Sequence, residues 1–229
     1  LKYLGMNITT NGLKTEIQPL SHTLENFEMT IPGDPSSASF FIAAALIVPG
    51  SDLIIKNILL NPTRTGFIKI LQRMGARISK IHEWQECGES VGDIQVQYSP
   101  LNSISIDRID IPSMIDELPI FALLATQADG ISEVTGAAEL RVKETDRIYA
   151  ICTNLKKMGA NIIEMKDGFI VEGPSRLNGC HIKTYHDHRI TMTFAIADLI
   201  SHENINLDNP ECIDISFPEF NETISKFSL

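Results

Sequence analysis

Basic side chains are scarce in this sequence, and that shortage limits the classes of protein it can be. Lysine and arginine number 19 against 29 aspartates and glutamates in 229 residues, so the formal net charge is −10. An acidic chain is poorly suited to nucleic acid, because such binding depends on basic side chains that neutralise phosphates. Any anionic ligand must therefore be attracted by a few local cations and not by the charge of the whole chain.

Long hydrophobic runs and paired cysteines are also lacking. The longest apolar run, at about 40–49, is too short to cross a membrane, and no signal-peptide pattern is recognisable, so we expect no membrane association. The four cysteines are scattered without CxxC spacing. We therefore expect reduced, mostly buried thiols in a cytoplasmic protein. These four residues are Cys87, Cys152, Cys180 and Cys212.

The most informative stretch that is present is 139–147, Glu-Leu-Arg-Val-Lys-Glu-Thr-Asp-Arg. An apolar helical pattern follows it at once, from Ile148 to Met158. Extended back by one turn, the buried face of this helix would include Glu144 and Arg147. Charges in such places usually meet a partner or a ligand, although an ordinary Glu–Arg pair that caps the helix is the simpler alternative.

A second predicted helix begins in the same unusual way. Arg189 stands at the start of a run, 190–200, that is apolar nearly all round. A cation in the first turn of a helix opposes the helix dipole, whereas an anion bound there would relieve the conflict. Two arginines in this position, Arg147 and Arg189, predict an anionic ligand held between helix N-termini.

These strings resemble a known family. The stretch 139–147 and Asp187-His188-Arg189 are similar to the C-terminal half of the 5-enolpyruvylshikimate-3-phosphate synthase family, in the wording of its glyphosate-tolerant class. Further matches run in family order across almost the whole chain. They are Gly-Asp-Pro-Ser-Ser-Ala-Ser at 33–39, Asn-Pro-Thr-Arg-Thr-Gly at 61–66, Pro-Ser-Met-Ile-Asp-Glu at 112–117 and Ser-Phe-Pro-Glu-Phe at 216–220.

An internal repeat agrees with the fold that this resemblance implies. A helix end, a glycine and a strand pattern recur around Gly5, Gly75 and Gly159, at a spacing that fits a supersecondary unit. The resemblance implies an α/β (α+β) fold, an enolpyruvyltransferase-type domain of βαβαββ repeats with buried helices and sheets outside. It assigns residues 1–31 to the end of another, N-terminal-half domain and 32–229 to the domain that contains the C-terminus. The first residue is not Met, and the chain reads as a fragment that starts within an element.

The residue patterns predict strands and helices in a repeated order. Predicted strands cover 27–31, 53–58, 77–82, 94–98, 103–109, 131–135, 161–165, 169–172, 181–184, 204–207 and 213–215. Predicted helices cover 34–48, 65–74, 117–127, 145–158, a segment that starts at about 187, and 218–227.

The resemblance also implies roles for individual residues. Asp116 corresponds to a general base that contacts shikimate-3-phosphate and takes the proton of its 5-hydroxyl, and Lys143 to a second ligand of that substrate. Glu144 corresponds to the acid that exchanges a proton with the methylene carbon of phosphoenolpyruvate. Arg147 and Arg189 correspond to two arginines that grip phosphoenolpyruvate, which suits the planar fork of a guanidinium.

Bland alternatives exist for several candidates. Ser113-x-x-Asp116 could be a helix-capping arrangement, and Asp34 is better explained as a cap than as a ligand. Two histidines at 186 and 188, with no third ligand, are a weak metal signal. Arg64 could line a cleft or be a solvated loop cation. The enolpyruvyl transfer that the resemblance implies needs neither a metal nor a redox cofactor, so we expect no cofactor.

Two departures from the family pattern affect the expected activity. A lysine expected three residues before the proline of Phe-Pro is replaced by Ile215. The N-terminal half of the family, which carries much of the phosphoshikimate site, is not in this sequence. We therefore expect a chain that is inactive alone, with that half as its partner in a complete monomer. The alternatives are a UDP-N-acetylglucosamine enolpyruvyltransferase and a non-catalytic repeat domain that binds a partner.

Overall fold

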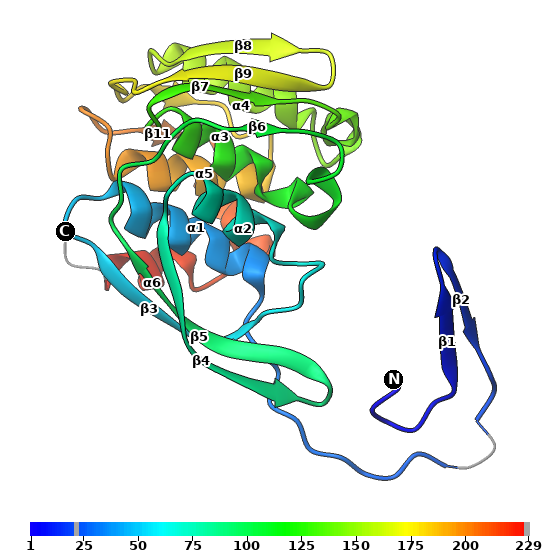
Figure 1. Cartoon of the computed structure of the whole chain (residues 1–229). Coiled ribbons are helices and arrows are strands. Elements are labelled where there is room, and N and C mark those ends of the chain that lie inside the picture. The colour runs from blue at the N-terminus through cyan, green and yellow to red at the C-terminus, as the bar shows by residue number, and fades with distance from the viewer. Residues whose placement is uncertain (21–22, 227–229) are drawn as a thin grey trace.

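Helices form the centre of the molecule and sheets lie outside them (Figure 1). The structure is a computed structural model that describes residues 1–20 and 23–226. The central helices α1 (Pro35–Ile47), α3 (Leu118–Ala125) and α5 (His188–Asp198) pack against one another. Every residue of α3 and most residues of α1 are buried. Helices that are apolar on all sides can only be stable when they are covered on all sides, which explains their central position.

An antiparallel sheet and a mixed sheet cover this helical centre. The first has the strand order β3-β5-β4, and the second has the order β6-β7-β9-β8. Figure 1 shows the first sheet below the central helices and the second above them. The strands are β3 (Asp52–Leu59), β4 (Arg77–Glu86), β5 (Glu89–Gln97), β6 (Ser105–Ile106), β7 (Gly130–Val134), β8 (Asn161–Met165) and β9 (Gly168–Gly173).

The predicted repeat is visible in the element order. The second unit is a complete βαβαββ sequence, β6-α3-β7-α4-β8-β9, in which α4 spans Arg147–Lys157. The first unit runs α1-β3-α2-β4-β5, with α2 at Gly66–Arg73, and only a parallel bridge from Gly33 to Ile58 replaces its first strand. The third unit holds β10 (His181–Ile182), α5, β11 (Asn206–Leu207) and α6 (Phe220–Ser225). The predicted fold class, with buried helices and outer sheets, is confirmed.

Two of the three glycines that were predicted to end helices do so, whereas Gly5 follows a turn and not a helix. Gly75 and Gly159 follow α2 and α4 directly and have φ angles of +94° and +96°. A residue with a side chain rarely adopts this left-handed conformation, so glycine is the residue that allows the chain to leave the helix and enter the next strand.

The predicted strand at 27–31 is wrong. Residues 23–32 contain no strand, and the side chains of Phe27, Met29 and Ile31 are exposed. The edge of β3 accepts only the Gly33 bridge, at Ile58, so the preceding residues have no partner strand. A strand pattern without a partner does not produce a strand.

The predicted strand at 213–215 is also wrong, because these residues end a 3-10 helix, Pro210–Ile215. Proline at the first helical position fixes a φ angle that suits a helix. The strand predicted at 103–109 is reduced to Ser105–Ile106, because the Asp107 carboxylate accepts a hydrogen bond from the Ile109 N–H at 2.8 Å and turns the chain. Of the helix predicted at 218–227, α6 is observed, and position 227 lies outside the described residues.

The other predicted elements are present, and β4 and β5 are several residues longer than expected. Of the four cysteines, Cys152 and Cys212 are buried, whereas Cys87 and Cys180 are partly exposed, and all four are free thiols. None of the helices in the described part of the chain has the length and apolar character that crossing a bilayer requires.

The N-terminal segment extends away from the helical body (Figure 1). It contains a two-stranded antiparallel hairpin, β1 (Ile8–Asn11) and β2 (Lys14–Ile17), whose side chains are nearly all exposed. Its connection to the body includes hydrogen bonds from Thr30 N–H to the Glu86 carboxylate at 3.1 Å and from Asn57 to the Ile31 carbonyl at 3.4 Å. The domain boundary at 31/32 stays a prediction.

We predict that a variant restricted to residues 32–229 unfolds cooperatively with nearly the same midpoint as the full chain. The removed segment buries little apolar surface against the body, so its loss should change the free energy of unfolding by less than about 1 kcal/mol. Thermal denaturation followed by circular dichroism measures this. A loss of the cooperative transition would show that the first 31 residues are part of the same folding unit.

Candidate functional site

The N-terminal ends of the three central helices converge on one place. Arg189, in the first turn of α5, donates to the backbone carbonyl of Asp116 at 3.3 Å, just before α3. Its Nη1 also lies 3.9 Å from the carboxylate of Glu117, the N-cap residue of α3. Ser36, in the first turn of α1, lies close enough to the Glu117 carboxyl to lower its pKa. Three positive helix ends therefore share one region, which favours anions.

Arg147, at the start of α4, is enclosed by carboxylates from three segments. Its Nε donates to Asp187 at 2.8 Å, its Nη1 to Asp116 at 3.0 Å and its Nη2 to Glu144 at 2.6 Å. The Arg147 side chain is 1% exposed and that of Asp187 is 0% exposed. This is a buried ion pair between the first turn of α4 and the residue that precedes α5, with two more carboxylates at its outer side.

Asp187 also caps α5. One of its oxygens accepts hydrogen bonds from the backbone N–H groups of Arg189 at 2.9 Å and Ile190 at 3.3 Å. The same carboxylate therefore binds Arg147 and fixes the first turn of α5. The position of Arg189 follows from this arrangement.

Asp116 is the point where the candidate cations meet. Its carboxylate lies 3.0 Å from Arg147, 3.7 Å from Arg189 and 3.9 Å from Lys143. The side chain of Asp116 is more than one-third exposed, so a ligand can reach it. The structure thus brings together all the predicted site residues, Asp116, Lys143, Glu144, Arg147 and Arg189.

Two details of the sequence interpretation are corrected. Asp116 does not cap α3 with Ser113, because Ser113 Oγ donates to the Asp110 carbonyl and Glu117 occupies the N-cap position without a side-chain cap bond. Glu144 does not lie on the buried face of α4, because that helix starts only at Arg147 and the Glu144 side chain is half exposed.

The simpler alternative, a Glu–Arg pair that caps the helix, is therefore right about the ion pair and wrong about the cap. Glu144 and Arg147 do form an ion pair, but Asp146 caps α4, accepting from the Tyr149 N–H at 2.9 Å. Arg141 stabilises the loop before α4, through ion pairs to Asp146 at 2.8 Å and Glu164 at 3.0 Å. This explains one charge of the 139–147 stretch that the sequence left unassigned.

Glu139, the other unassigned charge, pairs with Lys143 at 2.9 Å. Asp34 caps α1 as predicted, because it accepts from the Ser37 N–H at 2.9 Å. Arg64 pairs with Asp34 at 2.8 Å and donates to Ser36 at 3.1 Å, so it borders the same convergence of helix ends.

Two residues near the site were not assigned roles from the sequence. Glu117 is 5% exposed, and burial raises the pKa of its carboxyl. His188 is partly buried, and burial lowers the pKa of its imidazole. The position of Glu117 directly before a wholly apolar helix was the available signal, since a charge there is drawn into the core with the helix. Among the described residues, no group of three or more side chains could hold a metal ion.

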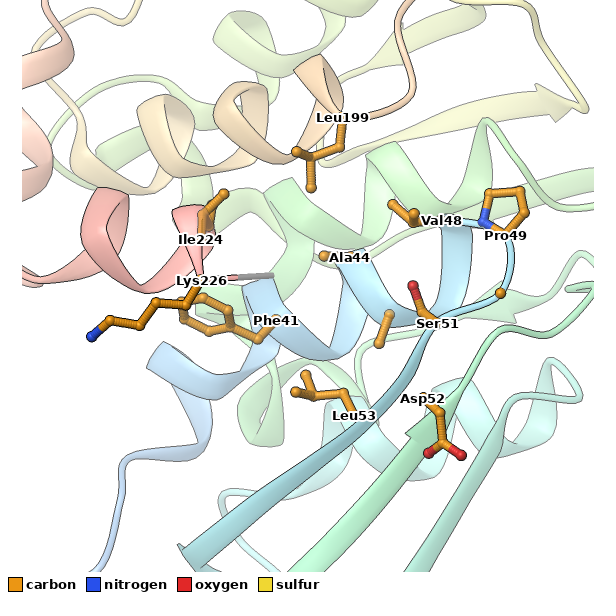
Figure 2. Close-up of a pocket in the computed structure, with 12 residues that line it drawn as sticks. Phe41, Ala44, Val48, Pro49, Ser51, Asp52, Leu53, Leu199, Ile224 and Lys226 are labelled. Carbon is orange, nitrogen blue, oxygen red and sulfur yellow. The ribbon is translucent and has the colours of Figure 1, made fainter. Parts of the chain in front are cut away.

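A cavity lies elsewhere, beside the C-terminal end of α1 (Figure 2). It has a volume of about 620 Å³ and is lined by apolar residues such as Ala44, Val48, Leu199 and Ile224. None of the predicted site residues lines it. The site around Asp116 is therefore separate from this cavity, and it lies at the N-terminal ends of the central helices.

We predict that Arg147→Met destabilises the chain by about 3–5 kcal/mol, because it leaves the Asp187 charge buried without a partner. The variant Arg147→Met/Asp187→Asn should recover part of this loss, since asparagine keeps a capping oxygen without a charge. Urea denaturation measures both. A change below about 0.5 kcal/mol for Arg147→Met would mean that the ion pair does not hold α4 to α5.

Comparison with known proteins shows the family of the chain. The family described as EPSP synthase (3-phosphoshikimate 1-carboxyvinyltransferase) matches residues 1–224. The 3-phosphoshikimate 1-carboxyvinyltransferase of Petrotoga mobilis is 49% identical over 227 residues, 99% of this chain and 52% of that protein. The corresponding protein of Endomicrobium trichonymphae is 47% identical over 227 residues, 98% of this chain and 53% of that protein. The chain spans about half the length of these relatives.

Solved structures show the same likeness. An EPSP synthase from Acinetobacter baumannii superposes with a TM-score of 0.94 at 36% identity, covering 99% of this chain and 52% of that one. The enolpyruvyl transferase NikO from Streptomyces tendae shares the fold alone, with a TM-score of 0.69 at 17% identity. The family match, the relatives and the superposition agree, and the chain belongs to the EPSP synthase (3-phosphoshikimate 1-carboxyvinyltransferase) family.

Proposed function

We propose that this chain forms one wall of an active site that transfers the enolpyruvyl group of phosphoenolpyruvate to the 5-hydroxyl of shikimate-3-phosphate. The products are 5-enolpyruvylshikimate-3-phosphate and phosphate. The observation that carries this proposal is the meeting of Lys143, Arg147 and Arg189 around the Asp116 carboxylate, where three helix N-termini converge. In a chain with a net charge of −10, such a cluster is a specific local device for anions.

The cations of the cluster differ in how free they are to bind a ligand. Arg147 is enclosed by carboxylates, whereas the Arg189 side chain is 16% exposed and that of Lys143 is 25% exposed. We assign phosphoenolpyruvate to Arg189 and the phosphorylated substrate to Lys143. Arg147 would act mainly by fixing Asp116 and Glu144 and by adding positive potential beneath the ligands. A direct contact between Arg147 and phosphoenolpyruvate requires that one of its carboxylate partners moves.

The two outer carboxylates suit opposite proton transfers. Glu144 would protonate the methylene carbon of phosphoenolpyruvate, Asp116 would take the proton of the 5-hydroxyl, and the hydroxyl oxygen would add to the adjacent carbon. The methyl group would then return a proton to Glu144 while the C–O bond to phosphate breaks, and the phosphate would leave with the proton that Asp116 took from the hydroxyl. Because both carboxylates contact Arg147, at 2.6 and 3.0 Å, its charge stabilises whichever of them is ionised.

The second wall would come from the N-terminal half that the relatives contain in addition to the matched region. We propose that the complete protein is a monomer that works in the cytoplasm, in agreement with its free thiols. A UDP-N-acetylglucosamine enolpyruvyltransferase is the alternative within the superfamily, and the 139–147 string favours the shikimate enzyme. A purely structural domain would have little reason to hold an enclosed arginine among three carboxylates, since such charges are costly to bury.

We predict that the 229-residue chain alone releases no phosphate from phosphoenolpyruvate plus shikimate-3-phosphate. Catalysis by fixed charges needs water to be excluded, which one wall cannot do. Joining the N-terminal half of the Petrotoga mobilis relative to this chain should produce a hybrid enzyme that turns over. Phosphate release, with the intact mass checked first, measures both. Turnover by the chain alone would contradict the need for a second wall.

We predict that Glu144→Gln in the hybrid lowers kcat by about 100-fold or more, because the amide cannot transfer a proton. Stability should change by less than about 1 kcal/mol, since the Glu144 side chain is half exposed and an amide oxygen still accepts from Arg147. Steady-state kinetics and thermal unfolding on the same preparation separate the two effects. Full activity with a large loss of stability would make Glu144 a structural partner of Arg147 only.

A further inference from the structure

Glu117 is a buried acid that the proposed chemistry does not use. It is 5% exposed, and its Oε1 has no hydrogen-bond partner in the described part of the chain. A buried carboxylate with an unsatisfied oxygen lowers stability, because the charge has lost its water without full compensation. A residue that lowers stability in this way at the edge of a site calls for a functional explanation.

The groups that face Glu117 come from all the elements packed around it. Ser36 of α1 lies near its carboxyl, Arg189 of α5 lies 3.9 Å from Oε1, and the charges of Arg64 and Asp116 act on it from nearby. Arg64 is already bound by close contacts to Asp34 and Ser36, at 2.8 and 3.1 Å. Within residues 1–20 and 23–226, Arg189 has no such close charged partner, because its nearest polar contacts are at 3.3, 3.7 and 3.9 Å.

We propose that Glu117 is a positioning residue for Arg189. Its carboxylate attracts the buried side of the Arg189 guanidinium, so that the exposed side of the guanidinium meets an anionic ligand in a fixed orientation. This inference rests on the proposed function, in which Arg189 binds phosphoenolpyruvate. The Glu117 carboxylate is the buried side of an ion pair, and the ligand would supply the other side.

The long distance between the two groups is part of the reasoning. A carboxylate in close contact saturates a guanidinium, as Asp187 does with Arg147 at 2.8 Å. At 3.9 Å, Glu117 attracts Arg189 without occupying its hydrogen-bond donors in the geometry that an anion needs. Glutamine has nearly the same shape but no charge, so the variant Glu117→Gln isolates the electrostatic hold.

The attraction between the Glu117 carboxylate and the Arg189 guanidinium depends on ionisation of Glu117. Burial raises the pKa of its carboxyl, and the nearby Asp116 charge acts in the same direction, whereas Ser36, Arg189 and Arg64 lower it. The ionised fraction therefore grows as the pH rises above the ordinary glutamate value of 4.5. We expect binding through Arg189 to tighten over that rise in the wild-type hybrid, and this component to be absent from Glu117→Gln.

The first test is a double-mutant cycle in the hybrid enzyme, with Glu117→Gln, Arg189→Ala and both together. Glu117→Gln should raise the KM for phosphoenolpyruvate roughly fivefold or more, with a smaller change in kcat, and the double variant should match Arg189→Ala within about twofold. Glu164→Gln is the matched control, because it removes the same charge from the ion pair of Arg141, outside the site. Its KM should equal that of the wild type.

The outcomes separate the inference from the function on which it rests. An unchanged KM in Glu117→Gln, while Arg189→Ala raises it, would overturn the positioning role and leave the proposed function intact. An equal effect of Glu117→Gln with and without Arg189 would show a purely structural role and overturn it too. An Arg189→Ala variant with wild-type KM would instead remove Arg189 from the anion site and the proposed function with it.

A second measurement uses the 229-residue chain itself and needs no activity. Nitrogen-15 NMR of the arginine Nε–H groups should show the Arg189 signal shifting with pH in step with the Glu117 carboxyl carbon. In a folded Glu117→Gln chain, this shared titration should vanish, whereas it should persist in Glu164→Gln. An Arg189 signal that titrates identically in wild type and Glu117→Gln would contradict the inference.

Discussion

The candidate site depends on the buried ion pair between Arg147 and Asp187. This contact joins the start of α4, in the second repeat unit, to the start of α5, in the third, at 2.8 Å with both side chains enclosed. Removing two charges from water is costly, and the cost is offset only where geometry and further hydrogen bonds are good. Here Asp187 also caps α5 and Arg147 also binds Asp116, so one pair fixes the relative positions of three segments.

Around this pair, the acidic chain brings three cations together with their carboxylate partners. Three helix N-termini point toward the same region, and Lys143 and Arg189 keep part of their surface open while Arg147 is enclosed. The three cations also differ in their partners among the described residues, because Arg147 contacts three carboxylates, Lys143 pairs closely with Glu139 alone, and the charged groups nearest to Arg189 lie 3.7 Å or more away. The enclosed arginine holds the architecture, and the open ones are available for a ligand. The proposed binding of an anionic substrate therefore depends on these local cations and not on the net charge of −10.

The sequence predicted what depends on local pattern and failed where partners are distant in the chain. The helix α5 was recognisable because its run is apolar nearly all round, and the glycine stops at Gly75 and Gly159 were recognisable by their repetition. The strand predicted at 27–31 was wrong because the alternation of apolar and polar residues does not show whether the edge of a sheet is available for pairing. The motifs correctly grouped Asp116 with Arg147, but no pattern showed that Asp187, 40 residues away, encloses that arginine. Glu117 was missed for the same reason, because its neighbours come from α1 and α5.

The repeat itself explains why these groups meet. Each unit contributes one central helix, and α1, α3 and α5 pack side by side with their N-termini at a common end. Asp34 and Ser36 come from the first unit, Asp116 and Arg147 from the second, and Arg189 from the third. A fold built from equivalent units thus places several positive helix ends together, whatever the side chains are. The charged residues add to the electrostatic potential that these backbone dipoles create. What such an end lacks is a cover that excludes water. In the proposed function a second body supplies this cover, and this chain spans only about half the length of its relatives.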